Sequence, residues 1–210
     1  MINQLASDTR SRLLESARKL FLEKGYGSTS IADILREAQA NSGSLYHFFP
    51  AKQDLLLAVL ETYLDGIRPL LLEPAWKGVD DPLERVFALL ALYRELLVAS
   101  DFTYGCPIGS LALELHEPDP AVRERLAANF AAWIDAVRQC LEDAGLAAGT
   151  DARQLAVLVL GVMEGAVMQA RTFRSPEPFD ACIRQLRLLL RSSYPMPSPA
   201  QEGSHDTRRS

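Results

Sequence analysis

The sequence predicts an all-α protein. Leucine and alanine dominate the 210 residues, and aromatic residues make up only 8% of them, a composition that favours helices. Apolar residues recur at helical spacing in every long segment, and no segment alternates polar and apolar residues as a half-buried strand does. Hydrophobic residues at 48% and charged residues at 23% are close to the averages of soluble globular proteins. These values exclude a disordered chain, a collagen-like repeat and a small disulfide scaffold.

The net charge of −5 and the pI of about 5.3 exclude a wholly basic nucleic-acid coat, although they allow a local basic face. Residues 1–52 carry 7 basic and 5 acidic side chains, whereas the remainder carries 15 and 22. Three cysteines without a CxxC pair indicate reduced thiols in a cytoplasmic protein. We expect neither a signal peptide nor a membrane span, because the longest apolar run, 155–163, is far shorter than about 20 residues.

The first quarter of the chain predicts three helices followed by a longer one. Thr9 is the expected N-cap of the first helix, which ends at Gly25. Thr29 or Ser30 caps the second helix, which ends at Ala38 and has the spacing of a capping box. The third helix is expected over 41–49 and the fourth from 52 to 64 or beyond, with prolines at 69 and 74 that mark its end or a kink.

The rest of the chain predicts five more helices from apolar periodicity and from prolines in the first helical turn. They are expected over 82–99, 107–116, 120–145, 151–173 and from about 178 to 191. Residues 192–210 are rich in Pro, Ser and charge, which predicts a disordered tail.

The segment 29–49 carries the pattern most informative about function. Its two short helices each have one apolar face, so they pack across each other and leave the N-terminal half of the second exposed. The residues presented there are small or flat hydrogen-bonding ones: Asn41, Ser42, Gly43, Ser44, Tyr46 and His47. Such side chains suit base edges and phosphate oxygens, so the pattern is consistent with a helix-turn-helix DNA reader. Periodicity alone is equally consistent with a helical hairpin that has a polar solvent face.

Residues 9–56 resemble the DNA-binding domain of the TetR family of bacterial transcriptional regulators. The matching residues keep the family's order and spacing: Thr9-Arg10, Ala17, Phe21, Gly25-Tyr26, Thr29 to Ile34, Ala38, Gly43 to Phe49, Lys52 and Leu55. Three positions depart from the common pattern. Gln39 stands where glycine is usual, Ala40 where valine is usual, and Ser42 where many members have a basic residue. The departure at Ser42 puts its base-reading assignment in doubt.

The resemblance implies a homodimer that binds a double-stranded DNA operator. It implies a helix-turn-helix domain over 1–51, an effector-binding and dimerisation domain over 52–191, and the tail over 192–210. Carried over by position, Tyr46 and Lys52 would hold phosphates, and Thr29 or Ser30 would offer a helix N-terminus to another. Ser42, Ser44 and His47 would face the major groove.

The two C-terminal helices are the expected dimer interface. The helix over 151–173 is apolar nearly all round, and Gly161 and Gly165 lie one turn apart on it, where a second helix could approach closely. Phe179, Ile183 and Leu186 form an apolar side of the last helix. The alternative is that both helices belong to the core of a monomer.

The resemblance also implies a small, apolar or aromatic effector. Candidate pocket residues are the aromatic residues and methionines of the larger domain, although each alone is also typical of plain core: Tyr63, Trp76, Phe87, Tyr93, Phe102, Tyr104, Trp133, Met163 and Met168. Glu164 is an acidic residue in an apolar helix and is either a buried polar contact or reaches solvent or the interface. We expect no cofactor and no metal, since Glu114 and His116 lack a third ligand.

Cys106 precedes a proline that should begin a helix. The positive end of a helix dipole lowers a thiol pKa, which would make Cys106 a redox or electrophile sensor. The surrounding segment also resembles one found in a TetR subgroup that includes electrophile- and oxidant-responsive repressors. The alternative is a small buried residue in a tight turn. Cys140 and Cys182 lie in helix interiors and are expected in the core.

The leading hypothesis is therefore a ligand-responsive transcriptional regulator, and specifically a repressor that releases its operator when an effector binds. The same fold acting through Cys106 as a thiol sensor is the first alternative. An all-helical enzyme without DNA binding is the other, and it is disfavoured because the sequence has three histidines and no HExxH, GxSxG or phosphate-loop motif. Neither the operator nor the identity of the effector follows from the sequence.

Overall fold

The computed structural model describes residues 2–147 and 149–194, and within them it contains helices and no strand. The all-α prediction is confirmed. Most of the predicted tail, residues 195–210, lies outside the described residues. The helical elements are α1 (Ile2–Lys24), α2 (Ile31–Ala38), α3 (Ser42–Phe48), α4 (Lys52–Gly66), η1 (Ile67–Leu72), α5 (Glu73–Trp76), α6 (Pro82–Ala99), α7 (Pro107–Glu114), α8 (Pro120–Asp143), α9 (Ala152–Phe173) and α10 (Glu177–Ser192).

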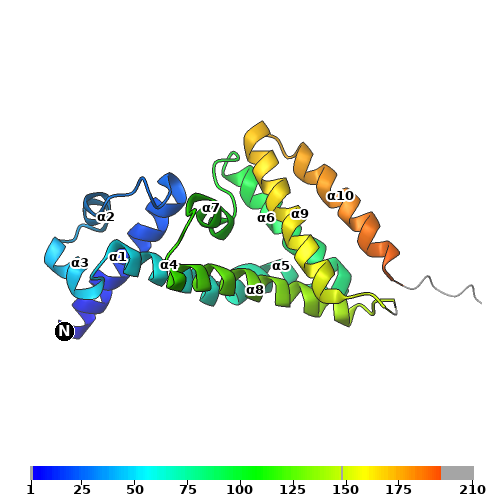
Figure 1. Cartoon of the computed structure of the whole chain (residues 1–210), viewed down its shortest axis with the longest axis horizontal. Coiled ribbons are helices and arrows are strands. Elements are labelled where there is room, and N and C mark those ends of the chain that lie inside the picture. The colour runs from blue at the N-terminus through cyan, green and yellow to red at the C-terminus, as the bar shows by residue number, and fades with distance from the viewer. Residues whose placement is uncertain (1, 148, 195–210) are drawn as a thin grey trace, which may run out of the picture.

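The helices gather into two groups joined along the length of the molecule (Figure 1). Helices α1, α2 and α3 pack together at one end with the start of α4. At the other end α6, α8, α9 and α10 form a bundle, and α4 lies against α8 between the two groups. The short helix α7 lies between the bundle and the α1–α3 group (Figure 1).

Most helix boundaries agree with the prediction, but the start of α1 does not. Helix α1 begins at Ile2, seven residues before the expected cap at Thr9. Residues 2–8 contain neither glycine nor proline, so nothing local stops the helix from extending toward the N-terminus. The aspartates before Pro82 and Pro120 cap their helices as expected, each accepting a hydrogen bond from a backbone N–H of the first turn.

The helix that begins at Lys52 neither ends nor simply kinks at Pro69. It widens into the π-helical segment η1 and continues as α5 to Trp76. A regular α-helix would set the Pro69 ring against the carbonyl group of Asp65, and proline offers no N–H to that carbonyl group. The wider π turn accommodates the ring without breaking the rod.

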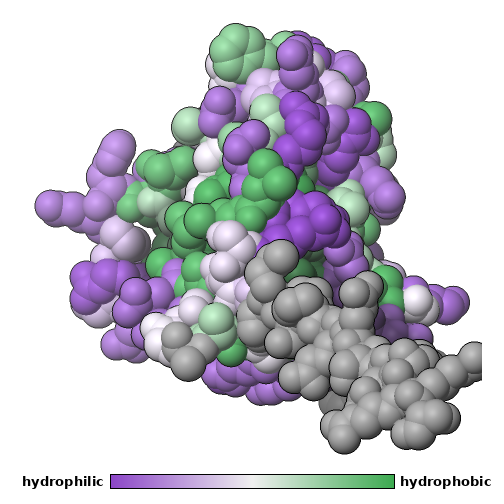
Figure 2. Space-filling view, turned by 90° about the vertical axis from the view of Figure 1, so that its right-hand side faces the viewer, coloured by the Kyte–Doolittle hydropathy of each residue, from purple (hydrophilic) through white to green (hydrophobic). Residues whose placement is uncertain are grey.

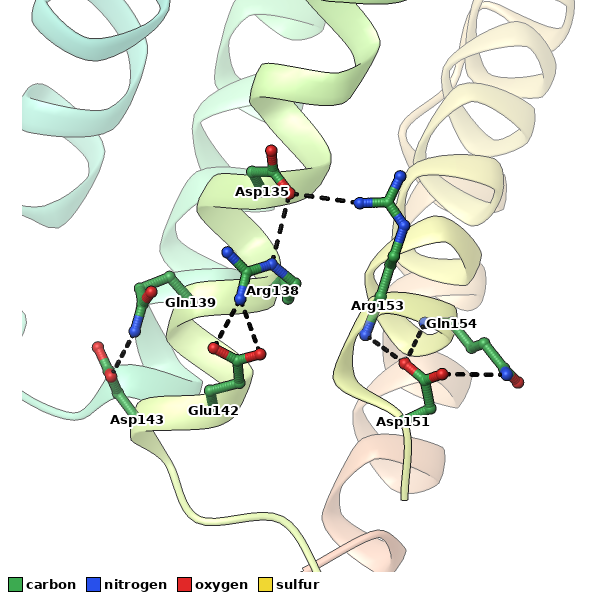
Figure 3. A network of polar contacts seen from close by, with 8 residues as sticks. All are labelled: Asp135, Arg138, Gln139, Glu142, Asp143, Asp151, Arg153 and Gln154. Carbon is green, nitrogen blue, oxygen red and sulfur yellow. Dashed lines mark hydrogen bonds and ion pairs between the residues drawn. The ribbon is translucent and has the colours of Figure 1, made fainter. Parts of the chain in front are cut away.

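A polar network joins α8 and α9 at the end of the bundle far from α1 (Figure 3). Arg138 binds Asp135 and Glu142 on its own helix, and Arg153 of α9 reaches Asp135 across a distance of 3.5 Å. Asp151 caps α9 through the backbone N–H groups of Arg153 and Gln154. These pairs are solvent-exposed, so they contribute little to stability, and apolar packing stabilises the bundle.

Candidate DNA interface and effector cavities

The α2–α3 unit is formed by local hydrogen bonds that its sequence specifies. Ser30 caps α2 in a capping box: its Oγ accepts from the Asp33 N–H at 3.1 Å, and the Asp33 carboxylate accepts from the Ser30 N–H at 3.1 Å. Helix α2 ends at Gln39, which has left-handed backbone angles (φ 49°, ψ 46°). Asn41 starts α3 by accepting a hydrogen bond from the Ser44 N–H at 2.8 Å.

Two buried side chains fix the orientation of α3. Leu45 and Phe49 lie in the core with Ile34 and Ala38 of α2. This packing leaves the opposite side of α3 free. The exposed residues on that side are four of the predicted DNA contacts: Ser42, Gly43, Tyr46 and His47. Tyr46 is 53% exposed, and Ser44 is half-buried beside the cap.

Two of the predicted DNA contacts are engaged elsewhere. Thr29 is buried, and its hydroxyl donates to the backbone carbonyl groups of Gly25 (2.7 Å) and Leu20 (3.2 Å), so its side chain cannot hold a phosphate. The Lys52 ammonium group donates to the Tyr26 carbonyl group and lies 4.2 Å from the centre of the Tyr26 ring. An ammonium group has three donors, so Lys52 keeps donors for a phosphate while it holds the turn after α1.

The same turn receives a contact from the larger domain that sequence reasoning missed. Glu114, the last residue of α7, accepts hydrogen bonds from the backbone N–H groups of Tyr26 (2.9 Å) and Gly27 (2.6 Å). Gly25 makes room for it, because a Cβ there would lie 2.9 Å from a Glu114 carboxylate oxygen, and its φ of +84° favours glycine as well. Glu114 therefore ties α7 to the α1–α3 group.

An inner cavity of about 60 Å³ lies in the middle of the larger domain, between α4, η1, α6, α7, α8 and α9. Four of the nine predicted pocket residues line it: Tyr63, Tyr93, Trp133 and Met163. Asn129 and Glu164 also line it. Within the described part of the chain, Asn129 Oδ1, Trp133 Nε1 and Glu164 Oε1 are buried without a hydrogen-bond partner. Buried polar atoms are normally paired, so these three suit a polar guest.

The Asn129 side chain is held in a fixed orientation. Its amide nitrogen donates to the carbonyl groups of Leu60 (3.0 Å) and Arg125 (2.9 Å), and the side chain is 2% exposed. The amide oxygen is therefore left as an acceptor at the cavity wall. Trp133, one turn later on α8, contributes an indole N–H donor near the Tyr93 hydroxyl, without the geometry of a hydrogen bond. Asn129 had no distinctive sequence signal beyond being a polar residue on an apolar helix stripe.

Cys106 and Glu164 separate the inner cavity from an outer cleft of about 780 Å³ between α7 and α9. Cys106 is the N-cap of α7, as predicted, and its Sγ accepts from the Gly109 N–H at 3.5 Å. The expected low thiol pKa is wrong: burial and the neighbouring Glu164 carboxyl group raise the pKa of Cys106. A buried neutral thiol does not provide the thiolate that a sensor needs. Burial likewise raises the pKa of Glu164.

A third space, the junction cavity, lies where α1 meets the larger domain and has a volume of about 710 Å³. Three of the predicted pocket residues line it, namely Tyr63, Tyr93 and Tyr104, whereas Phe102 and Met168 line the outer cleft. Trp76 and Phe87 line none of these three spaces. The Trp76 indole donates to the Arg85 carbonyl group, and Phe87 is covered by the Arg187 guanidinium group at 3.7 Å.

The outer face of α9 and α10 carries exposed apolar side chains. Figure 2 views the molecule from the right-hand side of Figure 1 and shows hydrophobic residues gathered across the middle of that view. The exposed apolar residues of these helices are Val157, Leu158, Met168, Phe173, Leu188 and Leu189. Gly161 and Gly165 have open space where a Cβ would stand. The expected contacts of Phe179 and Leu186 with a partner are wrong, because both are buried in the chain's own core, and Ile183 packs against that core.

Helix α9 is also long and apolar enough, by length and composition alone, to cross a membrane. A third of its most apolar window is buried inside the chain.

Comparison with known proteins covers both parts of the chain. Residues 13–59 match the family described as bacterial regulatory proteins, tetR family, and residues 82–185 match the C-terminal domain of LmrA/YxaF-like transcriptional regulators. An uncharacterised HTH-type transcriptional regulator of Mycobacterium tuberculosis is 35% identical over 89% of this chain and 96% of its own length. The HTH-type transcriptional repressor DhaR of Mycobacterium sp. is 26% identical over 81% and 86%.

A solved structure gives the same result. The regulatory protein TetR from Rhodobacter sphaeroides superposes with a TM-score of 0.77 at 28% identity, covering 85% of this chain and 96% of that one. The resemblance found in residues 9–56 is therefore confirmed, and it extends through the larger domain.

Proposed function

Because the chain belongs to the TetR family of bacterial transcriptional regulators, we propose that it is a homodimeric, cytoplasmic repressor that releases its DNA operator when a small molecule binds in its larger domain. Its relatives are transcriptional regulators, a class that is not enzymatic, and one of them is named a repressor. The DNA-binding part of this proposal assigns roles to the free side of α3. Ser42 and His47 read base edges in the major groove, with Gly43 allowing close approach, and Tyr46 binds a phosphate.

The effector part of the proposal is carried by the inner cavity. Asn129 Oδ1 is an acceptor and Trp133 Nε1 a donor, both are buried without a hydrogen-bond partner, and both residues border a space lined mainly by apolar side chains. A hydroxyl or amide group could satisfy both at once, and a buried polar atom left unpaired costs about 1–3 kcal/mol. We therefore propose an effector whose compact uncharged polar group enters this cavity of about 60 Å³, a volume too small for a whole drug-sized ligand. A carboxylate is disfavoured there because the residues that line this cavity include no lysine or arginine to pair with it.

Helix α7 links the effector to the DNA-binding domain in this proposal. Cys106 at its start lines the inner cavity, and Glu114 at its end binds the turn after α1. A ligand that displaces the start of α7 therefore shifts the contact at its end. In a symmetric dimer this would change the spacing of the two α3 helices and lower operator affinity.

DNA binding by the full chain tests the proposal. Fluorescence anisotropy would compare a labelled duplex from the chain's own upstream region with a random duplex of equal length at about 0.15 M salt. We expect His47→Ala to cost about 1–3 kcal/mol on the upstream duplex and little on the random one. Tyr46→Phe should weaken both equally. His116→Ala, an exposed histidine outside the α1–α3 group, is the control. A parent chain that binds the two duplexes equally would refute the proposal.

The effector assignment has its own test. Native mass spectrometry of chain purified without denaturation would identify any retained small molecule. We expect a neutral compound with a hydroxyl or amide group, retained less by Trp133→Phe than by the parent. A retained compound without a hydrogen-bonding group would contradict this assignment and leave the DNA-binding result unaffected.

A further inference from the structure

We propose that the junction cavity is a second ligand site, specific for an apolar molecule that carries one anionic group. The cavity combines residues of both domains, unlike the inner cavity, to which α1 contributes nothing. Glu15, Arg18 and Leu22 come from α1, and Tyr63, Leu71 and Tyr93 come from α4, η1 and α6. Its volume of about 710 Å³ is in the range of small-molecule sites. An occupant would therefore contact the DNA-binding domain directly.

The charge of the proposed ligand follows from Arg18. It is the one cation among the residues that line the junction cavity. Glu15 accepts from two of its nitrogens, Nε (2.9 Å) and Nη2, and because a guanidinium group has five N–H donors, donors remain for another acceptor. The Arg18 guanidinium group also lies close enough to the Tyr63 hydroxyl to oppose the effect of burial, which raises the pKa of Tyr63. A guanidinium fork beside a hydroxyl suits a carboxylate or phosphate group.

Glu15 can yield its place to such an anion. It is one turn from Arg18 on the same helix, and its side chain is 64% exposed. A surface pair of this kind contributes little to stability, because water competes for both partners. Released from Arg18, the Glu15 carboxylate would be hydrated, whereas the ligand anion would keep the guanidinium group neutralised inside the cavity.

The apolar body of the ligand follows from the remaining walls. The cavity walls include a run of leucines: Leu22, Leu70, Leu71, Leu96 and Leu97. Leu70 and Leu96 are 70% and 51% exposed, so the chain itself leaves their apolar surface in water. A hydrocarbon tail laid between them would remove that surface from water, which the hydrophobic effect favours. The combined requirement is an amphiphile with a single anionic head.

Decanoate and 1-decanol, both below their aggregation limits, are the probes that test this site. Isothermal titration calorimetry on the full chain should give at least a tenfold tighter Kd for decanoate. Arg18→Gln should abolish that preference. Glu15→Gln should tighten decanoate binding several-fold, because it removes the competing carboxylate. If the ion pair between Arg18 and Glu15 only stabilised the fold, Arg18→Gln and Glu15→Gln would change decanoate binding in the same way.

Arg138→Gln is the matched control, since Arg138 also forms an ion pair one turn away on its own helix but lines none of the three spaces. It should bind decanoate as the parent does. Equal affinity for acid and alcohol, no binding of decanoate, or decanoate binding unchanged by Arg18→Gln would each overturn the proposal. Loss of decanoate binding in Trp133→Phe would place the ligand in the inner cavity and overturn it as well. The effect of decanoate on DNA rests on the proposed function, but these binding measurements do not.

Discussion

Glu114 at the end of α7 accepts a hydrogen bond from the backbone N–H of Tyr26, 88 residues earlier in the chain. Gly27 donates a second bond to the same carboxylate, and Gly25 provides the space for it. The other end of α7 is Cys106, at the wall between two cavities. One eight-residue helix thus connects the ligand region with the turn that positions α2 and α3.

Glu114→Ala tests this connection. The variant should lose about 1 kcal/mol of stability, because two partly exposed hydrogen bonds to a carboxylate disappear. Its DNA affinity should respond less to effector, since movement of α7 no longer reaches the turn. Thermal unfolding and DNA anisotropy with and without effector measure the two effects. Glu117→Ala, an exposed acid just beyond α7, is the control. A full effector response in Glu114→Ala would show that α7 acts by another route.

Gln39→Gly should stabilise the chain by about 0.5–1 kcal/mol. The left-handed conformation costs a non-glycine residue about 1–2 kcal/mol, and the greater freedom of glycine in the unfolded chain offsets part of the gain. Gln39 is exposed, so its side chain contributes no packing. Chemical denaturation checks the value. Gln39→Ala keeps the strain and should show no gain, whereas equal behaviour of both variants would contradict the explanation.

Glu164→Gln should change how stability depends on pH. In the unfolded chain Glu164 ionises near its ordinary pKa of 4.5, and burial raises this pKa in the folded chain. Between those values the folded state holds a proton that the unfolded state has released, so stability falls as pH rises. The nearby Cys106 and Tyr93 also have raised pKa values and stay neutral in this range.

The Tm of Glu164→Gln relative to the parent should therefore rise from pH 4.5 to pH 8. Calorimetry at several pH values measures the difference. Glu124→Gln, an exposed carboxylate on α8, should keep a constant offset from the parent. A pH-independent offset for Glu164→Gln would mean that Glu164 is ionised in the folded chain.

Leu189→Glu should convert the proposed dimer to monomer. An unpaired carboxylate buried in an interface costs about 3–5 kcal/mol, and two-fold symmetry places one on each subunit. Gly161→Leu should act in the same direction by preventing close helix approach. Val98→Glu on α6 is the control, because Val98 and Leu189 are both 46% exposed. Sedimentation equilibrium gives the association state, and a Leu189→Glu dimer as tight as the parent would remove this face from the interface.

Features that depend on residues close together in the chain, such as helix caps, could be predicted from the sequence. The caps at Ser30 and Asn41 follow from side chains that bond their own helix starts, and the sequence narrowed the first cap to Thr29 or Ser30 and the start of the third helix to Asn41 or Ser42. Apolar periodicity showed that α10 has a face to bury, but it could not distinguish the chain's own core, which takes Phe179, from a partner. The contact of Glu114 with Tyr26 joins distant segments and has no local signature. Asn129 lines the inner cavity because α8 packs against distant segments of the chain such as α4, and no local pattern indicates that packing.

The π-helical segment η1 makes this stretch sensitive to chain length. Leu70 lies on the junction-cavity side, Ile67 on the inner-cavity side, and Leu71 borders both. Each residue added to or removed from a helix turns everything beyond it by about 100°. A one-residue deletion here would therefore change which leucine borders which cavity, although no side chain in the segment would have been substituted.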